Sequence, residues 1–153
     1  MDTERIDRLL ETACYIIDFL PVTVEREMSG QFFDVENYLL NSKRYLVLKD
    51  RFAAVILKVM CYYHVSVWQK EWIDRPSPEW IDYRIDQMTR ASEDSEENDS
   101  LDPLNLLLPK EDVLLVFHKD SLTMEVYNPP ESVQAILERI VSSEGLFWRK
   151  SCR

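Results

Sequence analysis

The first hydrophobic pattern along the chain has the period of an α-helix. In residues 3–20 the apolar side chains recur every three or four positions, with charged residues between them: Ile6, Leu9, Leu10, Ala13, Ile16, Ile17 and Leu20. This spacing would place them on one face of a helix. Pro21 cannot continue a helix, because it lacks a backbone N–H. The pattern therefore predicts an amphipathic helix over residues 3–20.

A second helical pattern occupies residues 45–63, after a further turn or two of helix over residues 32–40. Its apolar positions again repeat with a period near 3.6, and the rest of the segment is apolar as well. This is typical of a helix enclosed by neighbours on several sides. The many β-branched residues leave a strand as the alternative. A helix that continued through residue 72 would place His64, Trp68 and Trp72 on one face.

A third helix is predicted after the Pro76 break. Ser77 suits the N-cap and Pro78 the first helical position, and the helix extends to about Arg90. Ile81, Ile85 and Met88 supply the apolar stripe that faces the core.

The last third of the chain predicts a β-hairpin followed by a helix. Residues 113–118 form a continuous apolar run, and residues 122–127 alternate between apolar and polar side chains. Residues 130–143 have a helical period, and Gly145 is the expected stop. Because a two-stranded hairpin is only marginally stable alone, further strands are expected from residues 21–28 or 146–149.

These elements predict one α+β domain over residues 1–153. Its expected architecture is a helical N-terminal two-thirds packed against a small antiparallel sheet, which is built on the C-terminal hairpin and the helix after it. Residues 92–102 interrupt the pattern. They are rich in acidic and small polar residues and nearly free of apolar ones, which is typical of a flexible acidic linker.

The net charge of −10 comes mostly from that linker. Residues 93–102 contain six acidic residues and no basic one, whereas the remainder of the chain is close to balanced. An acidic surface of this kind favours a basic protein partner. A basic nucleic-acid footprint is absent, which argues against direct nucleic-acid binding, although Arg149, Lys150 and Arg153 form a small cationic tip that could touch an anionic partner. Two glycines in 153 residues exclude glycine-rich dinucleotide and phosphate-binding loops.

The cysteines and the absence of targeting signals predict a cytoplasmic protein. Cys14, Cys61 and Cys152 are an odd number and widely spaced, as expected of reduced thiols. The chain opens with a charged amphipathic stretch rather than a secretory signal. No apolar window approaches the roughly 20 residues that span a bilayer, so no membrane association is predicted.

Few residues suggest catalysis, and none predicts a metal or a cofactor. Cys61 and His64 are three positions apart, which on a helix would bring a thiol and an imidazole onto neighbouring turns. A buried structural Cys is the simpler interpretation. His118 is most simply a turn residue. Acidic pairs such as Asp82 and Asp86 have the spacing of a solvated helix face.

Aromatic residues supply the candidate binding surface. Three tryptophans fall within 13 residues and are interleaved with charged side chains. Tryptophan is enriched at interaction hot spots, although packing into the core is the alternative. The predicted binding residues are Trp68, Trp72, Asp74, Trp80 and Tyr83.

Three functions follow from these observations. The first is a non-enzymatic interaction or regulatory protein, such as an acidic inhibitor or an antitoxin-like antagonist of a basic protein. The second is a small cytosolic enzyme that uses Cys61 and His64. The third is a structural subunit of a homo-oligomer.

Overall fold

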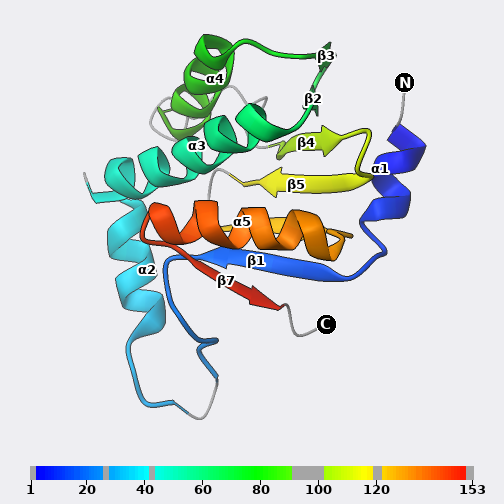
Figure 1. The fold of residues 1–153 in the computed structure, drawn as a ribbon. Helices are drawn as coiled ribbons and strands as arrows, with labels where there is room; N and C mark the ends of the chain where they lie inside the picture. The colour runs from blue at the N-terminus through cyan, green and yellow to red at the C-terminus, as the bar shows by residue number, and fades with distance from the viewer. Residues whose placement is uncertain (1–2, 26–27, 42–43, 91–101, 119–121, 151–153) are drawn as a thin grey trace.

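The computed structural model describes residues 3–25, 28–41, 44–90, 102–118 and 122–150. Its centre is a seven-stranded antiparallel sheet in the order β3-β2-β4-β5-β6-β1-β7 (Figure 1). The strands are β1 (Cys14–Asp18), β2 (Ser66–Trp68), β3 (Trp72–Asp74), β4 (Leu104–Leu108), β5 (Val113–Phe117), β6 (Thr123–Tyr127) and β7 (Phe147–Lys150). The helices are α1 (Thr3–Leu9), α2 (Phe32–Leu40), α3 (Arg44–Tyr62), α4 (Pro78–Arg90) and α5 (Glu131–Ser143).

One face of the sheet is covered by α3, α4 and α5, which lie on the same side in Figure 1. Alternate residues of each strand point into this layer, as the two-residue period of a strand requires. From β5 these are Val113, Leu115 and Phe117, and Phe52 of α3 packs against Phe117. The main hydrophobic core therefore lies between the sheet and these three helices.

The opposite face of the sheet carries a second, smaller core beneath α1. Ile6 and Leu9 of α1 pack against Leu107, Leu114 and other side chains that alternate with those of the main core. Burial of these side chains fixes α1 across the end of the central strands. Among the described residues, the sheet is thus covered on both faces, by three helices on one and by the short helix α1 on the other.

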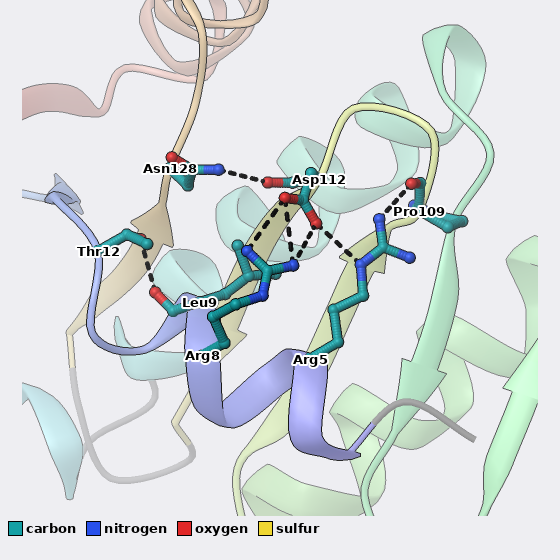
Figure 2. A network of polar contacts seen from close by, with 7 residues as sticks. All are labelled: Arg5, Arg8, Leu9, Thr12, Pro109, Asp112 and Asn128. Atoms are coloured by element: carbon teal, nitrogen blue, oxygen red, sulfur yellow. Dashed lines mark hydrogen bonds and ion pairs between the residues drawn. The ribbon is translucent and has the colours of Figure 1, made fainter.

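A polar network also holds α1 in place (Figure 2). Asp112, in the turn between β4 and β5, accepts hydrogen bonds from Arg5 and Arg8 of α1. Arg5 also donates to the Pro109 carbonyl. The amide of Asn128 donates to the Asp112 carbonyl at 3.0 Å. The turn therefore connects α1 to the end of β6 as well as to its own strands.

The expected architecture was wrong in two respects. The sheet has seven strands rather than being small, and the helices are distributed along the chain rather than forming a helical N-terminal two-thirds. The predicted helix over residues 3–20 is α1 followed by β1. Thr12 Oγ1 donates to the Leu9 carbonyl where α1 ends, and Cys14–Asp18 pairs with β6 and β7. The Cys14–Asp18 segment contains Tyr and Ile, which are residue types enriched in strands.

The α3 helix does not continue through residue 72, the condition under which His64, Trp68 and Trp72 would have shared one helix face. The helix ends at Tyr62, and Trp68 and Trp72 become directly opposed residues of the β2–β3 pair. They still share a face, but the face belongs to a sheet. The strand β4 was not predicted at all, and it joins the β2–β3 pair to the predicted C-terminal hairpin.

Other expectations are confirmed. The helix predicted for residues 45–63 is α3, and the predicted hairpin is β5 and β6. Ser77 Oγ accepts a hydrogen bond from the Trp80 amide at 3.1 Å and so caps α4. A strand does form at the C-terminal end, as β7. Almost all of the predicted linker, residues 92–102, lies outside the described residues. In the part of the chain that is described, no helix is long and apolar enough to cross a membrane.

Candidate interaction surface

Most of the exposed large apolar side chains in the described part of the chain belong to α2 and the segment before it. Ten large hydrophobic residues are exposed within the described ranges, and six of them belong to residues 22–38. No residue of α2 is buried, and Phe33 is 80% exposed. In Figure 1 this part of the chain projects beyond the sheet. We call these six side chains the α2 surface: Val22, Val24, Met28, Phe33, Val35 and Tyr38.

The C-terminal turn of α2 packs against the rest of the protein. Leu39 and Leu40, at its C-terminal end, pack against Leu48 of α3 and Leu122. Only this last turn contributes to a hydrophobic cluster. The helix is thus anchored by its C-terminal turn, and Phe33 in its first turn is exposed to solvent. Several exposed apolar side chains in one short segment make that segment a candidate interaction site.

A pocket of about 290 Å³ lies next to the N-terminal end of α2. Phe32 and Phe33 of α2 line one side, and Leu20 and Val24 of the preceding segment line another. Its volume is at the lower end of the range for small-molecule sites, on the order of 300 Å³. The pocket is therefore the right size for one or two side chains of a partner rather than for a large ligand.

A buried ion pair forms part of the wall of this pocket. Asp18, at the end of β1, is only 5% exposed and accepts a hydrogen bond from Arg149 of β7. Arg149 also donates to Thr23 Oγ1 and so ties the segment after β1 to the sheet edge. Because a buried charge is costly unless it is paired, this arrangement fixes both side chains in one position.

The segment of the chain that carries the α2 surface is also acidic. Residues 19–40 contain four acidic residues and one basic residue, a net charge of −3. With residues 93–102 they account for nearly all of the net charge, since 18 acidic and 17 basic residues remain elsewhere. Two of the four, Glu25 and Glu36, line the pocket. Exposed apolar side chains interspersed with acidic ones are complementary to a basic, partly apolar partner.

The five predicted binding residues do not share one surface. Trp68, Trp72 and Asp74 lie on the face of the sheet that α1 partly covers, with the two indole rings 6.2 Å apart. Trp80 and Tyr83 belong to α4, on the other face, where Trp80 packs against the main core.

The exposure of the five residues also differs. Trp68, Trp72 and Trp80 are each partly buried, and Arg84 stacks over the Trp80 ring at 4.9 Å. Only Asp74 and Tyr83 are largely exposed. Whether these residues contact a partner stays a prediction.

Asp74 organises a small polar cluster at the sheet edge. Its Oδ1 atom accepts a hydrogen bond from Ser66 Oγ at 2.6 Å and lies 2.5 Å from His64 Nε2. The Ser66 hydroxyl, with the His64 ring second, holds the pKa of Asp74 below its ordinary value. The Ser66 proton is directed to Asp74 and not to His64. The trio therefore lacks the serine-to-histidine contact that a catalytic triad needs.

Cys61 and His64, the candidate catalytic pair, contact different residues. Cys61 Sγ lies 3.6 Å from the Leu57 carbonyl in its own helix, whereas His64 contacts Asp74 on β3. His118 lies 3.2 Å from Glu125 on the adjacent strand. No group of three or more metal-ligating side chains occurs among the described residues.

The sequence pattern did not predict the α2 surface, because the spacing of apolar residues does not show which of them are exposed to solvent in the fold. Residues 32–40 have enough apolar side chains to suggest a packed helix, and only the folded chain shows that none of them is buried. The signal that the sequence did contain is the mixture of acidic and apolar residues over 19–40. No protein family, curated protein or solved structure matches this chain.

Proposed function

We propose that this chain is a non-enzymatic interaction protein whose α2 surface binds a basic, partly apolar segment of another protein. The observation that carries the proposal is the concentration of exposed apolar side chains in residues 22–38. An apolar residue of the partner would enter the pocket between Phe32 and Val24, and its basic residues would face Glu25 and Glu36. Binding of this kind would cover a basic surface on the partner, as an inhibitor or regulatory antagonist does.

Charge supports a basic protein partner over a second copy of this chain. Two α2 surfaces would bring a net charge of −3 each into one interface, and like charges at an interface oppose association. We place the interaction in the cytoplasm. Cys14 and Cys61 are free thiols within the described residues, in keeping with a reducing compartment.

The test uses the full chain and three labelled peptides of equal length. The first is an amphipathic helix of leucine and lysine, the second replaces lysine with glutamate, and the third scrambles the first so that it has no apolar face. Fluorescence anisotropy at low and high salt measures binding. We expect the leucine–lysine helix to bind best and to weaken as salt rises, because charge attraction is screened.

Two variants decide where the peptide binds. Phe33→Ser removes the most exposed apolar side chain of the α2 surface, and it should weaken binding by about tenfold. Tyr62→Ser, on α3, removes an aromatic ring that is 63% exposed and lies outside the α2 surface, so it should leave binding unchanged. Equal binding of the lysine and glutamate peptides, or equal loss in both variants, would overturn the proposal. Capture from cell extract with the wild-type and Phe33→Ser chains would then identify the natural partner.

A further inference from the structure

A second concave site lies on the helical side of the molecule, away from α2. It is a groove of about 520 Å³ between α3 and α5. Within each helix the contributing residues follow the i, i+3, i+4 pattern, which places them on one side of the helix, toward the groove. From α3 these are Lys58, Cys61 and Tyr62, and from α5 they include Ile136, Arg139 and Ile140.

One end of the groove is closed by contacts between the two helices. Lys58 Nζ donates to Ser143 Oγ at 2.9 Å and forms an ion pair with Glu144 at 2.5 Å. The charge of Lys58 is therefore matched by a carboxylate. These contacts join α3 to the C-terminal end of α5.

Arg139 differs from Lys58 because its guanidinium is available. It is exposed, and within the described residues it forms no ion pair or hydrogen bond. The positions one helical turn away on α5 are Ala135, Ile136, Ser142 and Ser143, none of which is acidic. Glu138 is adjacent in sequence and therefore points to a different side of the helix.

The remaining wall of the groove is mainly apolar. Ile136 and Ile140 of α5 and the ring of Tyr62, which is exposed, lie along it. A guanidinium presents a planar fork of donors that matches the two oxygens of a carboxylate or phosphate. The volume lies within the range of small-molecule sites. The groove thus combines a guanidinium that can bind an oxyanion, that of Arg139, with apolar side chains that can contact a hydrocarbon group.

We propose that the groove between α3 and α5 binds a small organic oxyanion, a carboxylate or phosphate ester with an apolar body, through Arg139. The oxyanion pairs with the Arg139 guanidinium, and the apolar body lies against Ile136, Ile140 and Tyr62. At physiological ionic strength charges are screened beyond about 8 Å, so the local cation outweighs the acidic segments elsewhere in the chain. This site is separate from the α2 surface and does not depend on the function proposed for it.

Cys61 provides a reporter for occupancy, because its exposed thiol lines the groove. The experiment measures the rate at which uncharged iodoacetamide alkylates Cys61 in a Cys152→Ser background. Cys14 is buried and should react slowly throughout. The probes are 4-phenylbutyrate, phenyl phosphate and the neutral 4-phenylbutanol. We expect saturable protection by at least one of the two anions and none by the alcohol, and the stronger anion identifies the oxyanion class.

Arg139→Gln is the decisive variant, with Lys110→Gln as its matched control. Both remove one positive charge from an exposed side chain, but Lys110 lies in the turn after β4, outside the groove. Arg139→Gln should raise the anion concentration needed for half-protection by about tenfold, the usual loss for a charge-assisted hydrogen bond. Lys110→Gln should leave it unchanged. Absence of protection, equal protection by the alcohol, or protection that survives Arg139→Gln would overturn the proposal.

Discussion

The guanidinium of Arg8 spans both carboxylate oxygens of Asp112, with Nη2 3.1 Å from Oδ1 and 3.3 Å from Oδ2 (Figure 2). Arg5 Nε donates to the same Oδ1 at 2.8 Å. Hydrogen bonds from Arg8, and then from Arg5, hold the pKa of Asp112 below its ordinary value. A single carboxylate therefore joins the two arginines of α1 to the turn between the central strands.

We expect Asp112→Asn to lower the free energy of unfolding at pH 7 by about 1 kcal/mol, because the ion pairs are partly exposed. Asn tolerates the left-handed backbone of this position, where φ is 61°. The folded-state pKa lies below the unfolded value of about 3.9. The charge therefore stabilises the fold above that pH, and its contribution is lost as the pH falls toward the folded-state pKa.

Urea unfolding of both chains from pH 7 downward checks this expectation. The difference between wild type and Asp112→Asn should be constant near neutral pH and shrink below about pH 4. Arg8→Gln provides the control, because it should lose most of its own effect in the Asp112→Asn background. Fully additive effects of the two substitutions would contradict the pairing.

The two glycines should respond to alanine in opposite directions. Gly145 follows α5 with a φ of 73°, and a Cβ there would lie 3.2 Å from Arg51 Nη1. Gly145→Ala should therefore lower the free energy of unfolding by about 1 kcal/mol or more. A Cβ at Gly30 would meet nothing within 4 Å. Gly30→Ala should raise stability by about 0.5 kcal/mol through the unfolded chain. Thermal unfolding gives both signs, and a destabilising Gly30→Ala would show that this position is constrained.

The sequence predicted those elements that have strong local signals. The Ser77–Pro78 pair marks the start of α4, and Gly145 marks the end of the last helix. The strands β2 and β3 were missed because three residues are too few to show a period of two. Ile16 and Ile17 satisfied a helical pattern by coincidence, and only pairing with β6 and β7 makes their segment a strand.

The candidate site was less predictable than the fold. Trp68 and Trp72 would have shared a face on a helix that continued through residue 72, but they lie opposite each other on two strands, β2 and β3, that were not predicted. Exposure of Phe33 depends on which parts of α2 are covered by distant residues such as Leu48 and Leu122. A single sequence contains no direct record of such long-range contacts.

Trp72→Ala should destabilise the fold, because the Trp72 ring packs against Trp68 and the core beneath α1. We expect a loss of about 1–3 kcal/mol in the free energy of unfolding, from lost burial and the aromatic pair. Tyr83→Ala removes a ring that is 62% exposed and should change stability by less than about 0.5 kcal/mol. Guanidinium unfolding followed by circular dichroism measures both. A Trp72→Ala chain as stable as wild type would show that the ring is free to serve as a contact surface.

The ion pair between Asp18 and Arg149 should act as a unit. Asp18→Leu alone leaves a mostly buried guanidinium without its carboxylate, and the expected cost is about 3 kcal/mol. Arg149→Met alone leaves the carboxylate unpaired and removes the contact with Thr23 as well. The pair is not ideally satisfied even in the wild type, since Asp18 Oδ1 and Arg149 Nε are buried without a hydrogen-bond partner among the described residues.

Replacing both charges removes these costs together. The double variant Asp18→Leu/Arg149→Met should therefore be more stable than either single variant, because apolar side chains of similar size often substitute well for a buried pair. Chemical unfolding of the four chains at one pH completes the cycle and isolates the coupling between the two side chains. Coupling near zero would mean that the two side chains contribute independently. A large coupling would establish that the interaction between Asp18 and Arg149 stabilises this part of the pocket wall next to α2.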